Sequence, residues 1–156
     1  MIYSRFFVVF LISLCFLSVW SQPSVIEIKK SNNKFQFYKN GKPYYIKGAG
    51  AKSSFKKIVE SGGNSIRLWS TNKSSLLDSA QKYGLSVCQG IWIAQERNGF
   101  DYNDDYNVKG QIELIKKEIL RVKDHPSIIL WGIGNEVDLK YSNFRVWETI
   151  EEMAKC

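Results

Sequence analysis

An apolar run that ends abruptly in a polar pair constrains this chain more than any other feature. Residues Ser127 to Gly134 have only small, apolar or aromatic side chains, and Asn135 and Glu136 follow directly. Such a run is typical of a strand that is covered on both faces in a parallel sheet. In barrels of alternating strands and helices, active sites lie at the carboxyl ends of the strands. The pattern therefore predicts a buried strand that delivers an amide and a carboxylate to a site.

Helical and strand-like segments alternate along the rest of the chain. The segments with helical spacing of apolar residues are 53–61, 75–83, 108–122 and 141–156. The third is the clearest, since its apolar residues are separated by four, three, four and three positions. Residues 85–93 read as a strand between the second and third helices. This alternation predicts a parallel sheet wrapped by helices.

Two further segments resemble parts of the same architecture. Residues 35–48 form two strand-like runs around Asn40-Gly41, a pair that tolerates the positive φ of a hairpin turn. The second run is expected to continue into the first strand of the sheet. Residues 62–69 read as the next strand, and Arg67 lies near its end.

Together, these segments resemble the catalytic barrel of clan A glycoside hydrolases, closest to family 2. The resemblance runs from about Phe35 to Asp138, and residues 125–136 (HPSIILWGIGNE) resemble the fourth barrel strand of that clan. It implies the amino-terminal half of a (β/α)8 TIM barrel, with about four βα units in residues 35–156. A closed barrel needs eight such units. We expect that the chain is truncated after the fourth unit and that its open sheet edges favour self-association.

The resemblance assigns roles to three residues. Glu136 is expected to be the general acid/base, Asn135 to hydrogen-bond the sugar 2-hydroxyl, and Arg67 to orient the nucleophile. Without the resemblance, a strand-end cap and a surface ion pair would explain the same residues. Trp69, Trp92 and Glu96 lie near predicted strand ends and are the candidates for substrate binding. The two tryptophans are equally compatible with a place in the core.

The implied activity is hydrolysis of O-glycosidic bonds with retention, which uses two carboxyl groups about 5–5.5 Å apart. The family takes its nucleophilic Glu from the seventh strand, which this sequence does not reach, so the fragment alone is expected to be inactive. The alternatives are a non-catalytic carbohydrate-binding or pseudoenzyme module and a transglycosylase. The expected partner is an oligosaccharide or polysaccharide. The chemistry needs carboxylates and water, so no metal or organic cofactor is implied.

The first 21 residues have the pattern of a secretory signal peptide, with Arg5 before an apolar run and small residues before Gln22. This predicts a secreted or periplasmic protein without stable membrane insertion, in which residues 22–34 form a short leader. Without those 21 residues, 21 basic and 15 acidic residues remain. The lysines at 29–30, 56–57 and 116–117 read as isolated, solvated pairs, although they would also attract acidic polysaccharides. No nucleic-acid patch stands out.

The segment from Ala94 to Asn107 is long for a βα connection and is predicted to be a substrate lid. Its Asp and Asn residues resemble the start of a calcium loop. Tyr106 stands where such a loop requires Gly, and Ile112 where it requires Glu, so calcium is rejected.

Overall fold

The computed structural model describes residues 22–155. The predicted signal peptide, residues 1–21, and Cys156 lie outside the described residues. The main sheet has four parallel strands in the order β4 (Gly48–Gly50), β5 (Ser65–Leu68), β6 (Ser86–Ile91) and β7 (Ile128–Ile133). Every neighbouring pair in it is parallel, so the chain is an α/β protein, as the sequence predicts.

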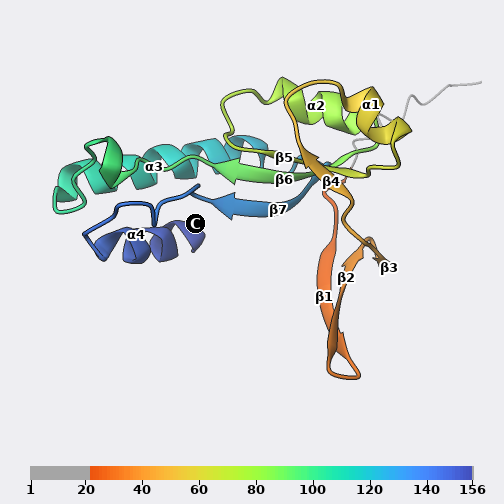
Figure 1. Cartoon of the computed structure of the whole chain (residues 1–156), viewed down its shortest axis with the longest axis horizontal. Helices are drawn as coiled ribbons and strands as arrows, with labels where there is room; N and C mark the ends of the chain where they lie inside the picture. The colour runs from red at the N-terminus through yellow and green to blue at the C-terminus, as the bar shows by residue number, and fades with distance from the viewer. Residues whose placement is uncertain (1–21, 156) are drawn as a thin grey trace, which may run out of the picture.

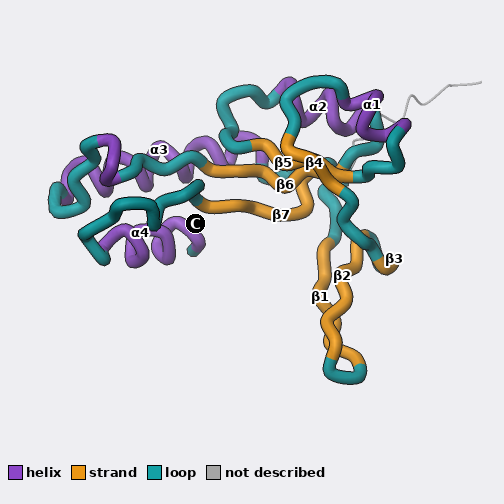
Figure 2. Tube along the Cα trace, in the orientation of Figure 1, coloured by secondary structure: helices purple, strands orange, loops and turns teal. Residues whose placement is uncertain are grey.

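Three helices connect the parallel strands and a fourth follows the last strand, and Figures 1 and 2 show the helices lying beside the sheet. They are α1 (Phe55–Glu60), α2 (Ser75–Lys82), α3 (Asp105–Val122) and α4 (Arg145–Ala154), with a short 3-10 turn η1 (Glu96–Asn98) after β6. The helix-facing sides of the strands form the core. Ile66, Leu68 and Val87 pack in one cluster with α1 and α2, while Ile91 packs in a second cluster with α3 and α4.

Helix α3 confirms the sequence pattern residue by residue. Val108, Ile112, Ile115 and Val122 are buried, and Ile119 is partly buried against the second cluster. The same 3.6-residue period leaves Leu114 exposed. The spacing of apolar residues therefore located both the helix and its buried face.

The prediction that β7 is covered on both faces is only partly right. Ile128 and Ile129 are buried, but Leu130 to Ile133 are half-buried. An open cavity of about 380 Å³ lies against the sheet and reaches β7 at Ile129. Arg67, Cys88 and Ile129 are among its lining residues.

A second, antiparallel sheet precedes the first. It consists of β1 (Ile26–Ser31), β2 (Lys34–Lys39) and β3 (Lys42–Pro43). The predicted turn between β2 and β3 is present, since Asn40 and Gly41 have φ of 52° and 74°. The segment 22–34, expected to be a short leader, contains β1, which pairs with β2 along its whole length.

Polar contacts fix this hairpin to the amino ends of the parallel strands. The Tyr44 hydroxyl lies 2.9 Å from the hydroxyl oxygens of both Ser65 and Ser86. Lys39 donates from Nζ to Ser86 Oγ at 2.8 Å. Burial lowers the pKa of the Lys39 ammonium, because a low-dielectric environment disfavours the charged form.

In residues 22–155, no helix combines the length and the hydrophobicity that a membrane-spanning segment requires.

Candidate functional site

The site lies at the carboxyl edge of the parallel sheet. Because β5, β6 and β7 run in the same direction, the residues that end or follow them meet at one edge. Arg67 is the penultimate residue of β5, and Asn135 and Glu136 follow β7 after Gly134. Arg67 donates from Nη2 to Asn135 Oδ1 at 3.2 Å. The fold therefore joins two of the predicted site residues that are 68 positions apart in sequence.

The backbone turns sharply where Glu136 is presented. Gly134 has φ of 76° and Glu136 has φ of 50°, both in the left-handed region. A Cβ atom on Gly134 would lie 2.9 Å from Val137 Cγ1 and 3.1 Å from Ile93 Cδ1. Two constraints therefore favour glycine at position 134: its positive φ and the lack of space for a Cβ atom. Val137 is buried behind the turn, while the Glu136 side chain is 65% exposed.

Two residues that follow β6 hold Asn135 and Glu136 from the side. Gln95 donates from Nε2 to the Asn135 carbonyl oxygen at 2.6 Å. Arg97 donates from Nη1 to the Glu136 carbonyl oxygen at 2.6 Å, and its Nη2 lies 3.3 Å from Glu136 Oε2. The Arg97 side chain is only 19% exposed, so its position is restricted by packing. The carboxylate that the sequence singles out therefore meets a fixed cation.

Glu96, which lies between Gln95 and Arg97, contacts a later part of the connection between β7 and α4. Its Oε1 accepts from the Ser142 hydroxyl, and its Oε2 accepts from the backbone N–H groups of Ser142 and Asn143 at 2.7 and 3.0 Å. These hydrogen bonds, the Ser142 hydroxyl first, lower the pKa of the Glu96 carboxyl by favouring its charged form. The sequence-based assignment of Glu96 to substrate binding meets a competing role here, since both carboxylate oxygens already accept hydrogen bonds.

The predicted lid is anchored rather than loose. Tyr102 is fully buried, and its hydroxyl donates to the Ala94 carbonyl oxygen at 2.6 Å. Asp104 caps α3 by accepting from the backbone N–H groups of Tyr106 and Asn107 at 3.0 and 3.1 Å. The segment from Ala94 to Asp104 is therefore a structured connection between β6 and α3.

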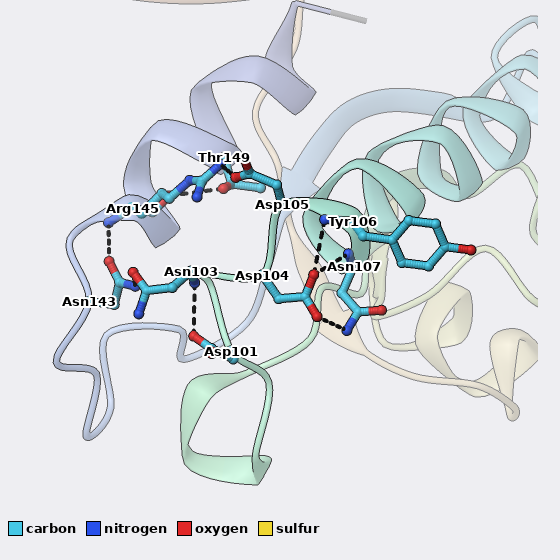
Figure 3. Close-up of polar contacts among 9 residues, drawn as sticks. All are labelled: Asp101, Asn103, Asp104, Asp105, Tyr106, Asn107, Asn143, Arg145 and Thr149. Atoms are coloured by element: carbon cyan, nitrogen blue, oxygen red, sulfur yellow. Dashed lines mark hydrogen bonds and ion pairs between the residues drawn. The ribbon is translucent and has the colours of Figure 1, made fainter.

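Figure 3 shows how the same segment is tied to α4. Asp105 forms an ion pair with Arg145 at the start of α4, and Asn143 donates from Nδ2 to Asn103 Oδ1 at 3.0 Å. The Arg145 ion pair lowers the pKa of the exposed Asp105 carboxyl, with the hydrogen bond as the larger cause. The connections that follow β6 and β7 thus form one joined surface.

The two candidate tryptophans occupy different settings. Trp69 follows β5 and is half-buried, with the Arg67 Cζ 5.5 Å from the centre of its ring. A Cβ atom on Gly50 would lie 2.4 Å from Trp69 Cη2, so the ring rests directly on β4. Trp92 follows β6 and is 49% exposed. Trp131 packs against both core clusters. Substrate contact by Trp69 and Trp92 stays a prediction.

One thiol lies close to the site. Cys88 on β6 is a free cysteine, and burial raises the pKa of its thiol while the Arg67 charge opposes that shift. Sequence reasoning overlooked this residue, Gln95 and Arg97 as neighbours of the site. The only available signal for Gln95 and Arg97 was their position just after a predicted strand.

Comparisons with known proteins agree with this architecture. A curated exo-β-D-glucosaminidase of Arthroderma benhamiae is 26% identical over 125 residues, which cover 65% of this chain and 14% of that protein. The structure of a β-glucuronidase from Bifidobacterium dentium, complexed with coumarin-3-O-glucuronide, has a TM-score of 0.62 at 19% identity. It is matched over 85% of this chain and 24% of that chain.

A GH2 β-galacturonidase from Eisenbergiella tayi, bound to galacturonate, has a TM-score of 0.60 at 22% identity, covering 86% of this chain and 25% of its own. At such identities, the two structures show a shared fold. The chain thus spans a quarter or less of the length of these relatives. The family model described as "Glycosyl hydrolases family 2, TIM barrel domain" matches residues 69–155, which is more than half of the chain. The chain belongs to glycosyl hydrolase family 2.

Proposed function

We propose that this chain is the amino-terminal half of a (β/α)8 catalytic barrel in an exported, retaining glycosidase, with Glu136 as the general acid/base. One observation carries the proposal: Asn135 and Glu136 leave β7 at the carboxyl edge, where Arg67 of β5 contacts Asn135 at 3.2 Å. Carboxyl edges of parallel α/β barrels are where catalytic groups are held. Export is proposed from the signal-peptide pattern of residues 1–21.

In the proposed reaction, Glu136 protonates the leaving glycosidic oxygen while a second carboxylate attacks the anomeric carbon. The resulting covalent intermediate is then hydrolysed by a water molecule that Glu136 deprotonates. The exposure of the Glu136 side chain supports this role, because the acid must reach an external oxygen atom. We assign the nucleophile to the remaining half of the barrel.

Asn135 and Arg67 would act on the sugar and on the nucleophile. The Asn135 side-chain oxygen accepts from Arg67, so its amide nitrogen is the group presented to a sugar hydroxyl. Arg67 would also hold the nucleophilic carboxylate, since a guanidinium has donors for more than one acceptor. The substrate class that the relatives support is a β-glycoside of a hexopyranose, because their names include a β-D-glucosaminidase, a β-glucuronidase and a β-galacturonidase.

The test compares two aryl glycosides that differ only in their leaving group. In the protein that carries this chain, Glu136→Gln should slow hydrolysis of a glycoside with a poor leaving group by about 10²–10⁴-fold. A dinitrophenyl glycoside, which needs no protonation on departure, should lose much less in its first step. Asp138→Asn, two positions away, is the matched control. Equal loss on both substrates would remove the acid role from Glu136.

The same experiment separates the non-catalytic alternative. Saturable glycan binding by the wild-type protein without hydrolysis of either aryl glycoside would support a carbohydrate-binding module. Transfer of the glycosyl group to an added alcohol acceptor in place of water would support the transglycosylase alternative.

A further inference from the structure

A basic hairpin projects from the α/β part of the molecule. In Figures 1 and 2, β1 and β2 extend away from the parallel sheet and its helices. Residues 26–47 contain six lysines and one glutamate, whereas the rest of the chain has 16 basic and 14 acidic residues. The excess positive charge of the chain is thus concentrated in this hairpin. Of the three lysine pairs that the sequence suggested were isolated, the pair Lys29–Lys30 lies in this hairpin.

One face of the hairpin combines a cation with exposed apolar groups. Directly opposite residues of an antiparallel pair lie on the same face, and the register pairs Lys30 with Phe35 and Ile28 with Phe37. Phe35 is 71% exposed and Ile28 is 66% exposed. Lys30 Nζ lies 5.7 Å from the centre of the Phe35 ring. An aromatic ring, an aliphatic side chain and an ammonium group are therefore presented together.

The opposite face adds two more exposed lysines. Lys29 and Lys34 both lie near the turn, which Asn32 and Asn33 form with φ of 49° and 58°. Lys29 Nζ lies 4.7 Å from the centre of the Tyr38 ring and 3.2 Å from Glu27 Oε2. Both faces of the hairpin near its turn thus carry positive charge. Among the described residues 22–155, Lys29 is the only one of these three lysines with an ion pair to an acidic side chain.

The base of the hairpin is held in place. Lys39 and Tyr44 make the hydrogen bonds to Ser86 described above, and the Tyr44 hydroxyl also contacts Ser65. Ser65 and Ser86 begin β5 and β6. The hairpin is therefore attached at the amino end of the sheet, whereas Glu136 lies at the carboxyl end.

We propose that the outer half of this hairpin, residues 28–36, is a docking surface for a linear acidic polysaccharide. Its carboxylate or sulfate groups would pair with Lys29, Lys30 and Lys34, and the apolar face of a sugar ring would stack on Phe35. Among residues 22–155, strand β1 has a neighbouring strand on one side only, so it offers an extended edge to a polymer. The surface is complementary in charge to such a polymer and distant from the proposed catalytic edge. The proposal therefore stands independently of the role of Glu136.

The experiment measures binding of polygalacturonate to the chain by isothermal titration calorimetry. Lys29→Gln/Lys30→Gln/Lys34→Gln removes three exposed cations from the hairpin. Lys109→Gln/Lys116→Gln/Lys117→Gln removes three exposed cations from α3 and is the matched control. Phe35→Ala tests the aromatic contact without a change of charge. Circular dichroism verifies that each variant is folded, and dextran and single-stranded DNA serve as neutral and non-carbohydrate comparators.

The hairpin triple variant should weaken polygalacturonate binding by about tenfold or more, and the α3 triple variant by less than about threefold, since screened charges act locally. Phe35→Ala alone should also weaken polygalacturonate binding, although it leaves the charge unchanged. Equal losses from the two triple variants, or no effect of Phe35→Ala, would overturn the docking surface. DNA binding as tight as polygalacturonate binding, with the same dependence on the hairpin, would overturn the assignment to carbohydrate.

Discussion

The guanidinium group of Arg97 contacts Glu136 at two points, the backbone carbonyl oxygen at 2.6 Å and the carboxylate at 3.3 Å. Glu136 has a left-handed backbone conformation, which a side chain with a Cβ adopts at a cost of about 1–2 kcal/mol. Arg97 offsets that cost by bonding to the same residue. The orientation of the proposed acid/base thus depends on a residue from the preceding βα connection.

Removing this guanidinium should loosen the segment that follows β7. Arg97→Gln is expected to lower the free energy of unfolding by about 1–3 kcal/mol, because a charge-assisted hydrogen bond to a backbone carbonyl is lost. Chemical denaturation measures the loss, and amide hydrogen exchange should accelerate at Val137 and its neighbours. Lys155→Gln, which removes an exposed i,i+4 pair with Glu151, is the control and should change stability by less than about 0.5 kcal/mol. Equal effects of the two variants would contradict the prediction.

The contact of Glu96 with residues 142–143 should depend on pH. Its pKa is lowered in the folded protein from an ordinary value of 4.5, so the charged form is favoured by folding. The stabilisation is therefore complete above the ordinary pKa and is lost as the pH falls through the lower, folded value. NMR amide shifts of Ser142 and Asn143 should change together in this acidic range. Glu96→Gln should abolish that change and Glu113→Gln, on exposed α3 surface, should keep it; persistence in Glu96→Gln would refute the assignment.

Two glycine substitutions separate backbone strain from packing. Gly134→Ala and Gly62→Ala both place an alanine at positive φ, 76° and 80°. Only Gly134 has side chains of Ile93 and Val137 within 3.3 Å of the added Cβ, whereas the space at Gly62 is open. Both variants should lose about 1–2 kcal/mol from strain, and Gly134→Ala should lose about 1 kcal/mol more from overpacking. Thermal unfolding tests this order. Equal losses of stability would show that Val137 and Ile93 move to make room for the added Cβ atom.

The Tyr44 hydroxyl should stabilise attachment of the hairpin. Tyr44→Phe removes the group that lies 2.9 Å from the Ser65 and Ser86 hydroxyls and should cost about 1–3 kcal/mol, because buried polar groups lose a partner. Tyr45→Phe, at the adjacent position where the side chain is 77% exposed, should be close to neutral. Calorimetric melting of the two variants measures the difference. If Tyr44→Phe leaves the melting temperature unchanged, a water molecule replaces the hydroxyl with no loss of stability.

The sequence predicted the regular elements where periodicity was strong. The stripe from Val108 to Val122 defined α3, and the apolar run before Asn135 defined β7, because burial of a continuous face imposes these patterns. The first residue of α4 was harder to predict from the sequence. Residues 141–144 were expected to be helical, but the helix begins at Arg145, since the N–H groups of Ser142 and Asn143 bond to Glu96. A side chain 46 positions away decided that boundary.

The site was only partly readable for the same reason. Asn135 and Glu136 could be selected because they follow an apolar strand and parallel strands end at one edge, whereas Arg67 was selected through the family resemblance. The contacts of Gln95 and Arg97 with the segment after β7 depend on how two irregular connections pack, for which local sequence has no period. β1 was also overlooked, because its alternation of apolar and polar residues runs only from Ile26 to Lys29 and breaks at Lys30.

Three consecutive residues bind the connection after β7. Gln95 bonds to the Asn135 carbonyl oxygen, Arg97 to Glu136 and Glu96 to Ser142. A protein engineer could not exchange that connection alone for one from another barrel, because its new backbone would have no matching donors and acceptors. Nor could the connection after β6 be shortened by a single residue, since the three side chains would then point at the wrong partners. The two connections therefore have to be transplanted together.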